Sequence, residues 1–178
     1  MANSLNSARQ HINCGRPKVA LEILEPIRNG VDSLEGSVEW VELPLLIGQA
    51  LVTAADTAAL AHLNSAAERL MSIKDPPVDL QIRVQEHLGH FYRSVAKRPS
   101  KAKEHYIAAK QIACNAHCNE EAARVQLKIC EIDLVTDKDP NLTNFQSSMR
   151  LGKAEFPATD ILEAWTLVIS TTESLLRV

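Results

Sequence analysis

The fold is indicated most clearly by the stretch LGHFY at residues 88–92, which is followed by AKEHYIAA at residues 102–109. Gly89 in the first stretch and Ala102 in the second carry little or no side chain, so two antiparallel helices can approach closely there. Tyr92 and Tyr106 supply the bulk that fills the space beside this contact. The two stretches therefore predict a pair of tightly packed antiparallel helices.

Weaker copies of the pattern precede this pair. Gly48 is followed by Ala59, and Ala8 is followed by Ala20, at similar separations. The anchor alanines Ala20, Ala59 and Ala102 are 39 and 43 residues apart. This spacing predicts a structure built from repeated helix pairs.

These units resemble tetratricopeptide repeats (TPR) of a long-period variety, since the common repeat has about 34 residues. The resemblance covers about residues 4–116, and residues 120–178 match it poorly. It implies an all-α, TPR-like solenoid, in which antiparallel helix pairs stack as a right-handed superhelix. The first helix of each pair would line a concave groove.

Clusters of Gly, Pro, Asp and Asn divide the chain into about nine segments of helical length. We expect helix pairs at about 4–29, 37–73, 78–116 and 120–151, and a terminal helix at 160–178. Asp56 is the expected N-cap of the fourth helix. Pro26 should kink or shorten the second helix, and Pro44 should make the third irregular.

Composition supports a single all-α domain over residues 1–178. The chain is 46% hydrophobic and only 4% aromatic, a mix that favours helices over sheets. Its net charge of −3 argues against nucleic-acid binding. The sequence has no secretory signal and no apolar stretch of about 18 residues, which predicts a cytoplasmic protein without a membrane span.

Sequence motifs give little support for an enzyme or a metalloprotein. No Gly-rich phosphate loop, G-x-S-x-G or H-E-x-x-H occurs, so we expect neither catalysis nor a cofactor. Cys114, His117 and Cys118 could converge on one helix face, and Cys130 or His105 could supply a fourth zinc ligand. No second ligand pair has zinc-site spacing, so thiols packed in the core are favoured over a zinc site.

A TPR-like protein commonly binds an extended or helical peptide in its groove. The groove side of the first helices should carry Arg9, Asn13, Gln49, Arg83, Glu86, His90, Arg93, Arg124 and Lys128. Arg and Lys would bind carboxylates or carbonyl groups of the peptide, and Asn and Gln its amides. Residues 93–103 hold five Lys and Arg and no acidic residue, a candidate patch for an acidic peptide, a carboxylate or a phosphate.

These observations predict a non-catalytic adaptor or scaffold that binds a partner protein or peptide. A regulatory peptide sensor or chaperone-type domain, as part of a longer protein, is the alternative. The apolar residues of the terminal helix, among them Trp165 and Ile169, spread over more than one face. This helix is therefore either wrapped by its neighbours or buried against a second protomer in a homodimer.

Overall fold

The computed structural model describes residues 2–28, 30 and 34–136. Seven helices and no strand occur in this part of the chain: α1 (Ala2–Asn13), α2 (Pro17–Arg28), α3 (Val38–Thr53), α4 (Ala59–Met71), α5 (Val78–Ser94), α6 (Pro99–Asn115) and α7 (Asn119–Thr136). The all-α prediction is confirmed for these residues, and the pairs α1–α2, α3–α4 and α5–α6 begin and end within two residues of the ranges 4–29, 37–73 and 78–116. The helices expected at 142–151 and 160–178 lie outside the described residues.

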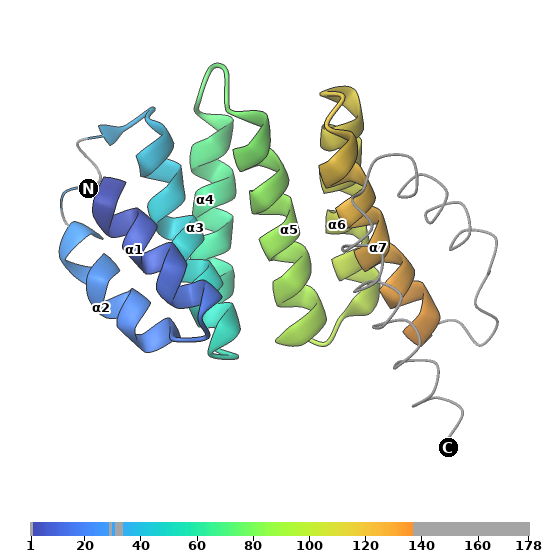
Figure 1. Ribbon diagram of the computed structural model, residues 1–178, viewed down its shortest axis with the longest axis horizontal. Helices are drawn as coiled ribbons and strands as arrows, with labels where there is room; N and C mark the ends of the chain where they lie inside the picture. Colours follow the sequence, from blue (N-terminus) through green and yellow to red (C-terminus); the bar gives the residue numbers. More distant parts are fainter. Residues whose placement is uncertain (1, 29, 31–33, 137–178) are drawn as a thin grey trace.

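The seven helices form two layers (Figure 1). Short connections make the helices of the pairs α1–α2, α3–α4 and α5–α6 antiparallel. Among the odd-numbered helices, α1 contacts α3 and α3 contacts α5, while each of α2, α4 and α6 contacts the odd helix of the next pair. Ion pairs join α5 to α7. We call the surface formed by the side chains that link α1, α3, α5 and α7 the odd-helix face.

The core consists of three apolar clusters, and each belongs to one even helix and the two odd helices beside it. Leu24 of α2, Leu63 of α4 and Tyr106 of α6 are fully buried at the centre of these clusters. Helix α3 is buried on two sides, since Leu43 belongs to the first cluster and Val41 to the second. Each even helix is thus held between two odd helices by apolar contact.

The tightest glycine contacts between helices lie at Gly48 and Gly89. A Cβ atom added to Gly89 would lie 2.5 Å from Cε1 of Tyr106, and one added to Gly48 would lie 2.7 Å from Cδ2 of Leu63. Real Cβ atoms do not approach neighbours this closely, so only glycine allows these helix separations. The close approach predicted from Gly89 is confirmed.

Proline 44 lies inside α3 without ending it. Because proline has no amide hydrogen, the carbonyl of Trp40, four residues earlier, lacks its helical donor. Nη1 of Arg69 on α4 donates to this carbonyl oxygen at 2.9 Å, and its guanidinium carbon lies 4.9 Å from the centroid of the Trp40 ring. At Pro44, a hydrogen bond between α4 and α3 therefore replaces the missing hydrogen bond within α3. Helix α2 likewise contains Pro26 and ends two residues later.

Besides the connection before α3, where Gly36 has a φ of +83°, four turns between helices contain a residue in the left-handed conformation. Gly15 has a φ of +68° after α1, while Ala55, Lys97 and His117 have φ values of 57°, 54° and 57° after α3, α5 and α6. This conformation costs a residue with a side chain roughly 1–2 kcal/mol. Three of the four turns are therefore strained in a way that glycine would relieve.

Asp56 does not have the role expected of it. Helix α4 begins at Ala59 rather than directly after Asp56. Oδ1 of Asp56 accepts the backbone N–H of Ala58 at 2.9 Å, two residues later. The carboxylate stabilises the turn that precedes the helix, as aspartate does in an Asx turn.

We expect the substitution Gly89→Ala to lower the free energy of unfolding by about 1–3 kcal/mol, because the added methyl group overpacks the contact with Tyr106. Urea unfolding measures this change. Gly30→Ala is the matched control, since its added Cβ would meet only the Ile27 carbonyl oxygen at 3.8 Å. A Gly89→Ala protein as stable as the Gly30→Ala protein would contradict the role assigned to this contact.

Candidate functional site

Seven of the nine residues predicted for the groove meet in two clusters of charged side chains on the odd-helix face. The first cluster centres on Glu42, which contacts Arg9 and Arg83. The second centres on Glu86, which contacts Arg124 and Lys128. Each cluster joins neighbouring odd-numbered helices, so the structure brings together residues far apart in the sequence.

Glu42 connects three helices. On α3, its Oε1 accepts a hydrogen bond from Nη2 of Arg9 on α1 at 2.6 Å and one from Nη1 of Arg83 on α5 at 2.9 Å. Arg83 also lies 3.5 Å from Oδ2 of Asp79, one turn earlier on α5. Because the Glu42 side chain is only 15% exposed, these charge-assisted bonds replace contacts with water.

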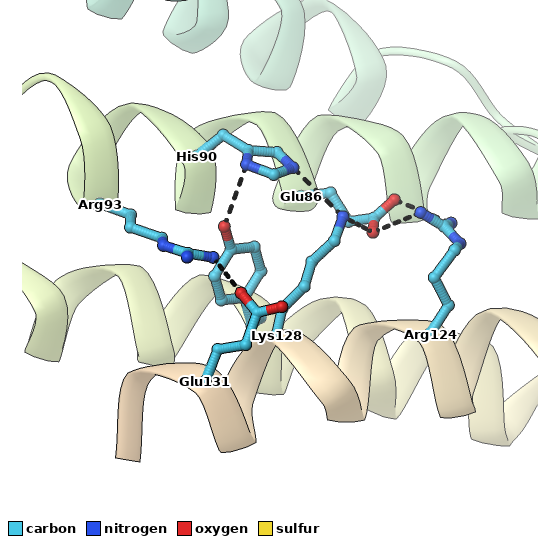
Figure 2. Close-up of polar contacts among 7 residues, drawn as sticks. Glu86, His90, Arg93, Arg124, Lys128 and Glu131 are labelled. Carbon is cyan, nitrogen blue, oxygen red and sulfur yellow. Dashed lines mark hydrogen bonds and ion pairs between the residues drawn. The ribbon is translucent and has the colours of Figure 1, made fainter. Parts of the chain in front are cut away.

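Glu86 is the most buried acidic side chain of the described residues, with 5% of its side chain exposed (Figure 2). Nη1 and Nη2 of Arg124 donate to its two carboxylate oxygens at 2.8 and 3.0 Å, and Nζ of Lys128 donates to Oε1 at 2.8 Å. Both cations come from α7. A buried carboxylate needs such partners to offset its lost hydration, so Glu86 sets how α7 lies against α5.

The cluster continues through His90 (Figure 2) to Tyr106. Nζ of Lys128 lies 3.1 Å from Nε2 of His90, and Nδ1 of His90 lies 3.3 Å from the Tyr106 hydroxyl. An ammonium group can only donate, so Nε2 accepts and the imidazole proton is on Nδ1. Burial, reinforced by Lys128, lowers the pKa of His90 to about 4, and burial raises the pKa of Tyr106 to about 12. Both groups are therefore neutral at pH 7.

The exposed edge of the cluster is formed by arginines. Nη1 of Arg93 lies 2.5 Å from Oε2 of Glu131, and these side chains are 43% and 33% exposed. The Arg124 side chain is 47% exposed. Arg93 and Arg124 therefore each hold an internal carboxylate while about half of the side chain remains exposed to solvent.

We expect Glu86→Gln to lower the free energy of unfolding by about 3 kcal/mol, because it leaves Lys128 and Arg124 without their buried counter-charge. Glu131→Gln is the matched control at an exposed pair, where a loss below about 1 kcal/mol is expected. Urea unfolding compares the two. Equal losses of unfolding free energy in the two variants would mean that burial does not make the ion pairs of Glu86 more stabilising than the exposed pair of Glu131.

His87 lies beside His90, with ring centroids 5.9 Å apart. Burial lowers the pKa of His87 to about 3, and His90 together with Arg83, Lys128 and Arg124 adds to the effect. A proton on either ring would place a further positive charge next to these cations. The folded protein therefore binds protons at the two histidines less readily than the unfolded chain does.

This difference predicts a loss of stability in acid. Between about pH 6.5 and 4 the unfolded chain takes up protons that the folded protein excludes, so the free energy of unfolding falls as the pH falls. We expect the two histidines together to account for a loss on the order of 5 kcal/mol over this range. Unfolding measured across this range should be less pH-dependent for His87→Gln/His90→Gln, and unchanged in slope for the control His11→Gln. An unaltered slope in the double variant would contradict the assignment.

Two carboxylates of the site, Glu42 and Glu131, were missed by sequence reasoning. The signal that could have found them is helical spacing. Glu42 precedes the predicted residue Gln49 by seven positions, and Glu131 follows Arg124 by seven, which is close to two helical turns and places each pair on one face. The carboxylates thus belong to the same face as the predicted cations.

Asn13 and Gln49 remain outside the clusters. Asn13 is exposed and Gln49 is half-buried. Neither side chain makes a hydrogen bond within residues 2–28, 30 and 34–136. The structure therefore does not join these two predicted residues to the other seven.

The cysteine cluster does not have the geometry that a shared helix face would give. Helix α6 ends at Asn115, so His117 and Cys118 lie beyond it, and His117 has a left-handed backbone. The expectation that these thiols pack in the core is wrong for Cys114, which is exposed, and Cys118 is only half-buried. Sγ of Cys118 donates to the Ala116 carbonyl oxygen at 3.7 Å. In the part of the chain that the structure describes, no three His, Cys, Asp or Glu residues are placed to hold a metal ion.

Comparison of the chain with protein-family models, with curated proteins and with solved structures finds no match. Among the helices described here, none combines the length and the apolar character that crossing a membrane requires.

Proposed function

We propose that this chain is a TPR-like helical-repeat domain that acts as a non-catalytic adaptor. It binds a segment of a partner protein on the odd-helix face. The segment carries carboxylates, which engage the exposed guanidinium groups of Arg93 and Arg124.

The proposal rests on one observation, the band of charged side chains that runs along the odd-helix face from α1 to α7. Glu42 links Arg9 of α1 to Arg83 of α5. Glu86 of α5 in turn pairs with Arg124 of α7, so the band extends to that helix. A band that crosses successive helix pairs suits an extended ligand, which can touch each pair in turn. Ordered guanidinium groups at its edge favour a carboxylate because they bind it in a planar, bidentate manner.

The repeated packing of the pairs supports the TPR-like part of the proposal. Gly48 against Leu63 and Gly89 against Tyr106 are equivalent contacts in two successive pairs. Both place a glycine of the first helix against a large residue of the second. This agreement extends the sequence resemblance to the level of side-chain packing.

The ion pairs decide which residues can be used in a test of binding. Charge reversal at Arg83 or Lys128 would place two carboxylates together at the buried Glu42 or Glu86 and would disturb the fold. Arg93 pairs only with the exposed Glu131 among the described carboxylates. Because this pair is much more exposed than those of Glu42 and Glu86, reversal at Arg93 costs less stability than reversal at Arg83 or Lys128.

We expect the protein to select peptides rich in Asp and Glu from a library of random peptides displayed on phage. Arg93→Glu should weaken the binding of a selected peptide at least tenfold, measured by fluorescence anisotropy. Lys18→Glu is the matched control, since it makes the same change in charge on an exposed position of α2.

Circular dichroism must show that the melting temperatures of both variants lie within a few degrees of the native value. Failure to select any peptide would contradict the adaptor proposal. Selected peptides that bind the Arg93→Glu protein as well as the Lys18→Glu protein would exclude the odd-helix face as the binding surface.

A further inference from the structure

The turn between α5 and α6 carries three exposed cations that the odd-helix face does not use. Lys97 and Arg98 lie in the turn, and Lys101 lies in the first turn of α6. None of the three forms an ion pair with another residue of the described part of the chain. We call these three residues the turn patch.

The flanking cations of the same basic stretch have a different role. Arg93 pairs with Glu131, and Lys103 pairs with Asp133 at 2.5 Å, so both attach α7 to the α5–α6 pair. Arg93 and Lys103, at the ends of the basic stretch, thus pair with carboxylates of α7, whereas the three cations between them have no carboxylate partner among the described residues. The nearest acidic residue along α6 is Glu104, one turn beyond Lys101.

The turn patch rests on an ordered base. The backbone N–H of Arg98 donates to the Tyr92 carbonyl oxygen at 2.7 Å, and Nζ of Lys101 lies 5.4 Å from the centroid of the Tyr92 ring. The same ring is stacked on His105, with centroids 5.2 Å apart and an angle of 5° between the planes, and it meets the Phe91 ring edge to face at 5.4 Å. The backbone at Arg98 and the ammonium group of Lys101 are thus both placed against Tyr92.

Lys97 occupies this surface in spite of its strained backbone. Its φ is 54°, in the region that favours glycine, and the corresponding turn after α1 has Gly15. A lysine here is less stable than a glycine would be. A substitution of Lys97 by glycine can therefore separate the effect of charge on binding from any effect on folding, because it should stabilise the protein while removing the charge.

We propose that Lys97, Arg98 and Lys101 form a docking surface for an acidic segment of a partner protein, separate from the odd-helix face. Three exposed cations without internal counter-charges attract a cluster of carboxylates. The amino end of α6 adds to this potential, since its first turn contains no acidic residue.

Two other anionic partners fit the turn patch less well. Single-stranded nucleic acid binds by stacking bases on free aromatic faces, but Tyr92 is stacked on His105 and carries Lys101 near its ring. An anionic membrane favours longer basic clusters, with apolar side chains that insert. The exposed large apolar residues of the described chain are Val19, Val38, Met71 and Ile107, and none lies in this turn.

The test uses a fluorescein-labelled peptide of alternating Glu and Ser, followed by anisotropy at low salt. The variant Lys97→Gln/Arg98→Gln/Lys101→Gln should weaken binding at least tenfold. The control Arg16→Gln/Lys18→Gln/Lys74→Gln has the same net charge, removes exposed cations elsewhere, and should change binding less than twofold. Equal weakening by both variants would overturn the proposal, because it would show a general effect of net charge.

A single variant separates binding from folding. Lys97→Gly should raise the melting temperature by relieving the backbone strain, and weaken peptide binding about threefold. A loss of binding therefore cannot come from a damaged fold. Unchanged binding by Lys97→Gly and by the triple variant would overturn the proposal.

The remaining outcomes distinguish the turn patch from its competitors. Binding lost in Arg93→Glu but kept in the triple variant would assign the peptide to the odd-helix face, supporting the proposed function and overturning the turn patch. Tighter binding of phosphatidylserine vesicles, or of a thymidine oligonucleotide, than of the peptide would also overturn it. Weaker binding by the triple variant than by its control variant, with neither competitor bound more tightly than the peptide, is the expected result.

Discussion

The contact of Gly89 with the Tyr106 ring is the constraint on which much of the molecule depends. The missing side chain at position 89 brings α6 close to α5, and the fully buried tyrosine fills the space between them. The same tyrosine directs its hydroxyl at His90 and lies beneath Nζ of Lys128. The packing that holds the helix pair together therefore also places the polar groups through which α7 attaches to α5.

Apolar and polar contacts have different roles along the stack. Each even helix is fixed by an apolar cluster that it shares with two odd helices, whereas the odd helices are further joined by carboxylates shared between arginines and a lysine. Apolar burial provides most of the stability and is tolerant of sliding. Ion pairs contribute less but require a particular geometry, so Glu42 and Glu86 fix the register between neighbouring pairs.

The sequence predicted helices better than contacts. Helix bounds follow from proline, glycine and capping residues close by in the chain, and the Gly89 contact follows from a local pattern. The partners of the predicted cations lie 33 to 42 residues away, where small differences in repeat length decide which carboxylate meets which cation. The left-handed conformation at His117 could not be predicted either, because glycine is the usual sequence signal for it and this position has histidine. That turn ends the helix on which the cysteine cluster was expected to converge.

The hydrogen bond from Arg69 to the Trp40 carbonyl makes two distant positions interdependent. With proline at 44 the carbonyl needs an outside donor, and with any other residue there the helix would supply its own amide. An arginine at 69 without the proline would compete with that amide, and the proline without the arginine would leave a carbonyl unsatisfied. Positions 44 and 69 should therefore covary among related sequences, although they are 25 residues apart in the chain.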